Sequence, residues 1–153
     1  MCARTRHLSL GAAGEEAAAS FLRELGWRIV ARNWRPAGAY RGFELDVVAQ
    51  SKGVLVFVEV KTRTVRKYAG QKQIQHVGLH VPVYAAFTHT KQARMVCAAR
   101  HYLAEHGLWD APCRFDLICV ERSPDRGMQL EHLHNVIEFG NFVDSSNTAW
   151  QPW

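Results

Sequence analysis

Long apolar runs and paired cysteines are both scarce in this sequence. No stretch approaches the length of a membrane-spanning helix. Residues 1–16 lack the apolar run of a secretory signal and turn acidic at Glu15 and Glu16, unlike a transit peptide. The four cysteines show no C-x-x-C spacing, so we interpret them as small buried hydrophobes in a reducing compartment. We therefore expect a cytoplasmic protein that has no membrane segment.

Internal repeats and low-complexity segments are absent too. The 153 residues predict one domain over residues 1–139, followed by a polar C-terminal tail over residues 140–153. A hydrophobic content of 48% with 22% charged residues excludes a disordered chain. The net charge of +5 favours a nucleic-acid partner, because each neutralised phosphate releases counterions. Many proteins without such a partner are equally basic, so the charge alone leaves both interpretations open.

Hydrophobic periodicity predicts the order helix, three strands, helix, two strands. The helices are expected over residues 11–25 and 91–106, and the strands over 27–34, 43–50, 54–61 and 114–121, with a last strand or a mixed segment over 128–138. Thr90 is the expected N-cap of the second helix and Gly107 its stop. The segment between the third strand and the second helix, 62–88, is expected to be a long loop. Such an order predicts an α/β protein with a helix on each face of a sheet.

The stretch FELDVVAQSKGVLVFVEVK, residues 43–61, reads as a β-hairpin whose turn ends at Gly53. Its second strand is apolar on both faces, which is typical of a central strand. Side chains alternate along a strand, so pairing in a hairpin would bring Asp46, Glu59 and Lys61 to one side of the sheet. Clustered acids that stay ionised usually hold a cation, and carboxylate oxygens suit Mg²⁺ or Mn²⁺. A bound cation and a neighbouring lysine predict phosphodiester hydrolysis.

The spacing of Asp46 and Glu59-Val60-Lys61 resembles the D…(D/E)-x-K signature of the PD-(D/E)xK superfamily of restriction-endonuclease-like nucleases. Other segments are similar to the UPF0102, or YraN-like, family of bacterial endonuclease-like proteins. These segments are Leu10-Gly11, Gly14-Glu15, Ala18, Leu22, Gly26, Ala31-Arg32-Asn33, Glu44-Leu45-Asp46, Val56 to Arg63, Lys91 to Arg94, Arg114-Phe115-Asp116 and Glu131-His132. The resemblance implies a restriction-endonuclease-like three-layer fold, a central mixed β-sheet flanked by helices, related to archaeal Holliday-junction resolvases.

The resemblance also implies an activity and roles for single residues. Asp46 and Glu59 would hold the metal and Lys61 would be catalytic, with Glu15 as an accessory acid and Glu44 as support. The residues implied to face the phosphate backbone are Arg32, Arg63, Lys91, Gln92 and Arg94. The implied function is a Mg²⁺- or Mn²⁺-dependent endonuclease acting on DNA, in branched or recombination and repair intermediates. Resolvase-like relatives that cut two strands act as dimers, which implies a homodimer.

Two departures from the family pattern stand out: Phe43 occupies a position where the family usually has Gly, and the segment before Lys91 is less regular. Three alternatives remain open: an ordinary ion pair between Glu59 and Lys61, a nucleic-acid-binding module without turnover, and a partner-binding scaffold. The late acid Asp116 has no assigned role. Histidine and cysteine pairs lack the four-ligand spacing of a structural zinc site. These pairs are His76 with His80, Cys97 with His101, and His132 with His134.

Overall fold

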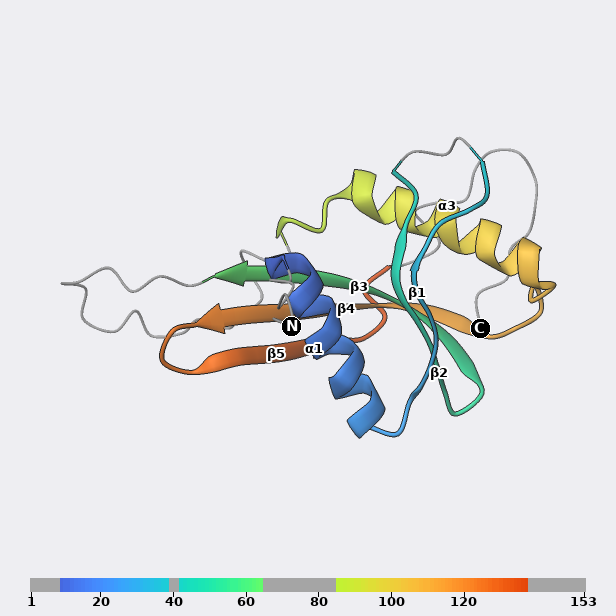
Figure 1. Cartoon of the computed structure of the whole chain (residues 1–153). Helices are drawn as coiled ribbons and strands as arrows, with labels where there is room; N and C mark the ends of the chain where they lie inside the picture. Colours follow the sequence, from blue (N-terminus) through green and yellow to red (C-terminus); the bar gives the residue numbers. More distant parts are fainter. Residues whose placement is uncertain (1–8, 39–41, 65–84, 138–153) are drawn as a thin grey trace, which may run out of the picture.

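The computed structural model describes residues 9–38, 42–64 and 85–137 (Figure 1). Its elements are α1 (Leu10–Glu24), β1 (Arg28–Trp34), β2 (Leu45–Ser51), β3 (Val54–Thr64), α3 (His89–His106), β4 (Cys113–Ser123) and β5 (Gly127–Leu133). The five strands form one sheet in the order β1-β2-β3-β4-β5, in which only β3 and β4 run parallel. The predicted α/β class and mixed sheet are therefore confirmed. Neither helix in the described part of the chain is long and apolar enough to cross a membrane.

The two helices cover opposite faces of the sheet (Figure 1). On one face, Ala18 and Leu22 of α1 pack against a valine-rich surface that includes Val56 and Val58 of β3. The chain favours a helix here because it is rich in alanine, and the Ser9 hydroxyl accepts a hydrogen bond from Ala12 N at 3.2 Å. The α1 face of the sheet is thus built mainly from short and β-branched side chains.

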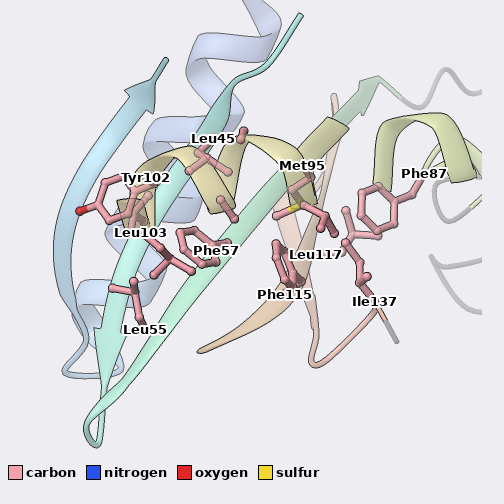
Figure 2. Packing of buried hydrophobic residues seen from close by; sticks show 14 of the residues in the cluster. Leu45, Leu55, Phe57, Phe87, Met95, Tyr102, Leu103, Phe115, Leu117 and Ile137 are labelled. Atoms are coloured by element: carbon pink, nitrogen blue, oxygen red, sulfur yellow. The ribbon is translucent and has the colours of Figure 1, made fainter. Parts of the chain in front are cut away.

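The second face is covered by α3 and carries larger side chains (Figure 2). Tyr102 and Leu103 of α3 lie over Phe57 of β3, and Phe57 stacks on Phe115 of β4 with ring centroids 5.3 Å apart. Phe43, which precedes β2, is partly buried and packs against this cluster. This bulky side chain is therefore accommodated beside the core of the α3 face.

The predicted hairpin is confirmed, with a tight turn at Lys52 and Gly53. Both residues have positive φ, 49° and 82°, as a type I′ turn requires. The turn sets the register in which Val47 lies opposite Val58. Because register is fixed here, the alternation of β2 and β3 decides which side chains share the α3 face.

Several predicted boundaries were wrong by a few residues. Helix α3 starts earlier than expected because Thr88, not Thr90, is its N-cap and accepts from Lys91 N at 3.3 Å. Strand β3 runs on to Thr64, since its last residues pair with β4, where the sequence predicted a loop. Strand β5 ends at Leu133 instead of 138. Most of the predicted loop and the predicted tail, residues 65–84 and 138–153, lie outside the described residues.

Candidate functional site

Glu59 is a buried acid near the end of the apolar part of β3. It lies on the α3 face, two residues beyond Phe57, and is only 1% exposed. Its Oε1 atom is 2.5 Å from Lys61 Nζ and 3.2 Å from Lys91 Nζ. Its Oε2 atom is buried and has no hydrogen-bond partner among the described residues. A buried carboxylate oxygen without a partner is costly, so its presence needs an explanation.

Asp46, near the start of β2, is the second acid of this site. Its Oδ2 atom accepts a hydrogen bond from Val60 N at 2.8 Å, which ties the carboxylate to β3 next to Glu59. Burial, and then repulsion by the Glu59 charge, raise the pKa of Asp46 from 3.8 to about 7, although the Val60 N–H and the Lys91 charge oppose the rise. The structure therefore brings Asp46, Glu59 and Lys61 together, and it adds Lys91 to them.

Two further acids were predicted for this site, and the structure places them differently. Glu15 of α1 lies close enough to Asp46 for its charge to raise the pKa of that group. Glu44 precedes β2, and its carboxylate pairs with Arg35 at 2.7 Å. Glu15 is thus a neighbour of the two central acids, whereas Glu44 is engaged by its own partner.

Several of the residues predicted to face a phosphate backbone have partners within the chain. Arg32 pairs with Glu16 at 2.6 Å, and Arg63 pairs with Glu121 at 2.8 Å. The Gln92 side chain donates to Phe87 O at 3.0 Å, next to the start of α3. Arg94, in contrast, is exposed on α3. The structure gives three of these residues partners within the chain and places Lys91 beside the acids.

A second polar cluster surrounds a buried acid on the opposite, α1-covered face of the sheet. Asp116 of β4 is fully buried and accepts hydrogen bonds from Arg114 Nε at 3.0 Å, His132 Nε2 at 2.9 Å and Asn135 N at 2.9 Å. Burial alone would raise the pKa of Asp116, but the hydrogen bonds from His132, Arg114 and Asn135 N, together with the Arg114 charge, outweigh burial and lower that pKa. The rings of Phe21 and Trp27 pack edge-on against His132. We call these four hydrogen-bonded residues, Arg114, Asp116, His132 and Asn135, the Asp116 cluster.

Asp116, His132 and His134 could together hold a metal ion. One ligand atom from each lies within 4.8 Å of the other two. The guanidinium of Arg114 already contacts two of them, since Nη2 is 3.1 Å from Asp116 Oδ2 and 3.3 Å from His134 Nδ1. The sequence singled out the two histidines but missed Asp116 as their partner. Only the pairing of β4 with β5 brings them together, and no spacing in the sequence signals it.

Several known proteins are similar to this chain over most of its length. The model of a family described as "Uncharacterised protein family UPF0102" matches residues 14–120. A UPF0102 protein of Lawsonia intracellularis is 41% identical over 144 residues, 94% of this chain and 96% of that protein. One of Nitratidesulfovibrio vulgaris is 40% identical over 150 residues, 97% of each chain. One of Symbiobacterium thermophilum is 43% identical over 127 residues, 83% of this chain and 94% of that protein. The matched range includes Asp46, Glu59 and Asp116 and ends before His132.

Proposed function

We propose that this chain, which belongs to the uncharacterised protein family UPF0102, is a metal-dependent endonuclease that hydrolyses phosphodiester bonds in DNA. One observation carries the proposal: the partnerless Oε2 atom of Glu59 is buried beside Asp46, whose pKa is raised to about 7. Two neighbouring carboxylates, one half-buried and one buried with an oxygen that has no donor among the described residues, are the arrangement expected of a cation site.

The residues of the site fit Mg²⁺ or Mn²⁺. Both ions prefer oxygen ligands, and Mg²⁺ is usually held by one or two carboxylates together with water. Asp46 and Glu59 would supply the carboxylates, and Glu15 of α1 would add negative charge nearby. The ion, when bound, would lower the pKa of a water molecule and neutralise charge on a phosphate. Because ligands must be deprotonated, binding near neutral pH would displace the proton that the raised pKa of Asp46 favours.

Lys61 has the position that the hydrolysis requires of a lysine. It follows Glu59 on the same face of β3, and its Nζ is 2.5 Å from Glu59 Oε1. Its side chain is 27% exposed, so the ammonium is open to a substrate while its carboxylate partner stays buried. In our proposal Lys61 orients the attacking water and offsets the negative charge that develops on the phosphate. This gives the three residues of the D…(D/E)-x-K pattern separate roles.

The fold supports a wider proposal. We place the chain in the restriction-endonuclease-like superfamily, related to archaeal Holliday-junction resolvases, because its mixed sheet carries a helix on each face and its acids lie on a central hairpin. Branched DNA is then the substrate to test first. We also propose a single domain over residues 1–139, a cytoplasmic location and action as a homodimer.

A panel of labelled branched, flap, duplex and single-stranded DNAs, with RNA for comparison, tests the activity. Wild type is expected to cleave at least one DNA in the presence of Mn²⁺ and none after chelation. Glu59→Gln should slow cleavage by about 1,000-fold, since a bound cation contributes several kcal/mol to transition-state stabilisation. Glu24→Gln is the matched control, because it removes the same charge from an exposed position at the end of α1.

Two outcomes would contradict the proposal. Equal cleavage by wild type and Glu59→Gln would show that the catalytic site lies elsewhere. Salt-dependent DNA binding without Mn²⁺-dependent cleavage of any substrate would instead indicate a nucleic-acid-binding module without turnover.

A further inference from the structure

Glu59 forms ion pairs with lysines from two elements that are far apart in the chain. Lys61 belongs to β3 itself, whereas Lys91 reaches the same Oε1 atom from the first turn of α3. For Lys61, proximity follows from strand alternation alone. For Lys91 it depends on how α3 docks on the sheet, so the second contact is a product of tertiary structure.

The position of Lys91 in its helix is electrostatically unfavourable. The N-terminal end of a helix carries partial positive charge, so acids are favoured there and cations disfavoured. The first turn of α3 has no acid, and its third residue is Lys91. The helix therefore gains nothing from this ammonium, and the favourable partner of Lys91 is Glu59, 3.2 Å away.

Lys91 also differs from Lys61 in how firmly it is held. The Lys61 contact is short, 2.5 Å, and is a hydrogen bond made within one strand. The Lys91 contact is longer, 3.2 Å, and joins two separate elements, whereas the exposed fractions of the two lysine side chains are almost equal, 27% and 28%. A divalent cation at Glu59 would repel both ammonium groups, and Lys91 is the one that can more easily leave.

Resting on the function proposed above, we propose that a divalent cation displaces the Lys91 ammonium from the Glu59 carboxylate. We call this replacement the exchange. Without the cation, Lys91 neutralises the buried carboxylate. With the cation bound, Lys91 turns outward and binds a phosphate oxygen of the DNA beside the metal. Lys91 is then a substrate-binding residue that acts only when the metal is present, and metal and DNA bind cooperatively.

This exchange makes two predictions that can be tested without cleavage. Losing Lys91 should weaken DNA binding about tenfold in the presence of the cation, as expected for one charge-assisted hydrogen bond. It should change DNA binding less than about twofold without the cation, because Lys91 is then engaged by Glu59. Losing Lys91 should also tighten cation binding in the absence of DNA, because a competing positive charge is removed.

The experiment compares wild type, Lys91→Gln and Arg94→Gln. Affinity for a labelled branched DNA is measured by fluorescence anisotropy in Ca²⁺, which takes oxygen ligands, and again in a chelator. Mn²⁺ affinity without DNA is measured by titration calorimetry. Arg94→Gln is the matched control, because Arg94 carries the same charge one helical turn away and is exposed. It should weaken DNA binding equally under both conditions.

Three outcomes would overturn the exchange and leave the proposed function intact. The first is an equal loss of DNA affinity in Lys91→Gln with and without Ca²⁺, and the second is the same Ca²⁺ dependence in Arg94→Gln. The third is weaker Mn²⁺ binding by Lys91→Gln. Failure of wild type to bind DNA under any condition would overturn the proposed function, and the exchange with it.

Discussion

Glu59 and Asp116 are buried acids on neighbouring strands, and they face opposite sides of the sheet. Glu59 lies on the α3 face, beside Leu117 of β4, and Asp116 lies on the α1 face, beside Val58 of β3. Their exposures are nearly the same, 1% and 0%. Their surroundings are not: Asp116 receives an arginine, a histidine and a backbone N–H, whereas one oxygen of Glu59 receives no donor among the described residues.

The contrast separates two reasons for burying a charge. Asp116 is compensated within the chain, and its lowered pKa shows that its partners outweigh the cost of burial. The site around Glu59 is under-compensated, and the raised pKa of Asp46 shows that burial and repulsion dominate there. A satisfied buried acid contributes to the fold, whereas a buried carboxylate oxygen without a donor beside a second acid points to a ligand.

The largest difference between the two faces should appear in stability. Asp116→Asn is expected to lower the free energy of unfolding by about 3 kcal/mol, because the buried carboxylate loses its charge-assisted hydrogen bonds from Arg114 and His132 and the new amide places N–H groups beside those donors. Glu59→Gln should change it by less than about 1 kcal/mol, because both lysines that contact Glu59 can reach solvent. Urea denaturation followed by tryptophan fluorescence, without metal, gives both values.

The comparison would fail if Glu59→Gln cost as much stability as Asp116→Asn. It would also fail if zinc raised the melting temperature of wild type but not of Asp116→Asn. That result would show that Asp116, His132 and His134 hold a metal ion and that the α1 face carries a ligand site too.

The second difference is a pH dependence that involves Asp46. Its pKa is about 7 in the folded chain and ordinarily 3.8, so folding retains a proton that unfolding releases. Stability should therefore fall as pH rises from about 4 to about 7. Wild type should lose about 2 kcal/mol more than Asp46→Asn between roughly pH 5 and pH 8. Parallel urea titrations of the two proteins at both pH values, without metal, measure this difference.

For Asp116 the sign is opposite, because its pKa is lowered in the folded chain. Its contribution to stability should be complete at neutral pH and lost only as pH falls below its ordinary range. An identical pH dependence of wild type and Asp46→Asn would contradict the raised pKa and weaken the case for a cation site.

The smallest effect concerns the contact between α1 and the end of β3. A Cβ atom added to Gly14 would lie 1.9 Å from Thr62 Oγ1 and 2.9 Å from Thr62 Cβ. Gly14→Ala should therefore destabilise the protein by about 1–2 kcal/mol, although alanine favours a helix. Gly11→Ala is the control in the same helix, because nothing lies within 4 Å of its added Cβ, and it should be neutral or stabilising.

Adding Thr62→Ala to Gly14→Ala should restore part of the lost stability, and a double-mutant cycle measures the coupling. Coupling near zero would show that α1 shifts freely on the sheet. Glu15 would then not be held near Asp46 by this contact, and its place in the site would need another explanation.

Much of the fold, and the placement of Asp46, Glu59 and Lys61 in the site, follow from local patterns in the sequence. The apolar periodicity predicted both helices and the order of the elements along the chain, and the turn at Lys52 and Gly53 fixes the register of the hairpin. With that register, alternation is enough to bring Asp46, Glu59 and Lys61 together. The errors lie at element ends, as at Thr88, where competing caps are close in sequence and only packing selects one.

Sequence alone therefore determined the hairpin and the acids that it presents, because side-chain alternation is a property of the strand itself. Tertiary structure decided the rest: that Lys91 contacts Glu59, and that Asp116 meets His132. The first contact depends on how α3 docks, and the second on the parallel pairing of β3 with β4 and the return of β5. Contacts between distant segments are set by the free energy of packing the whole core, and no local spacing in the sequence records them.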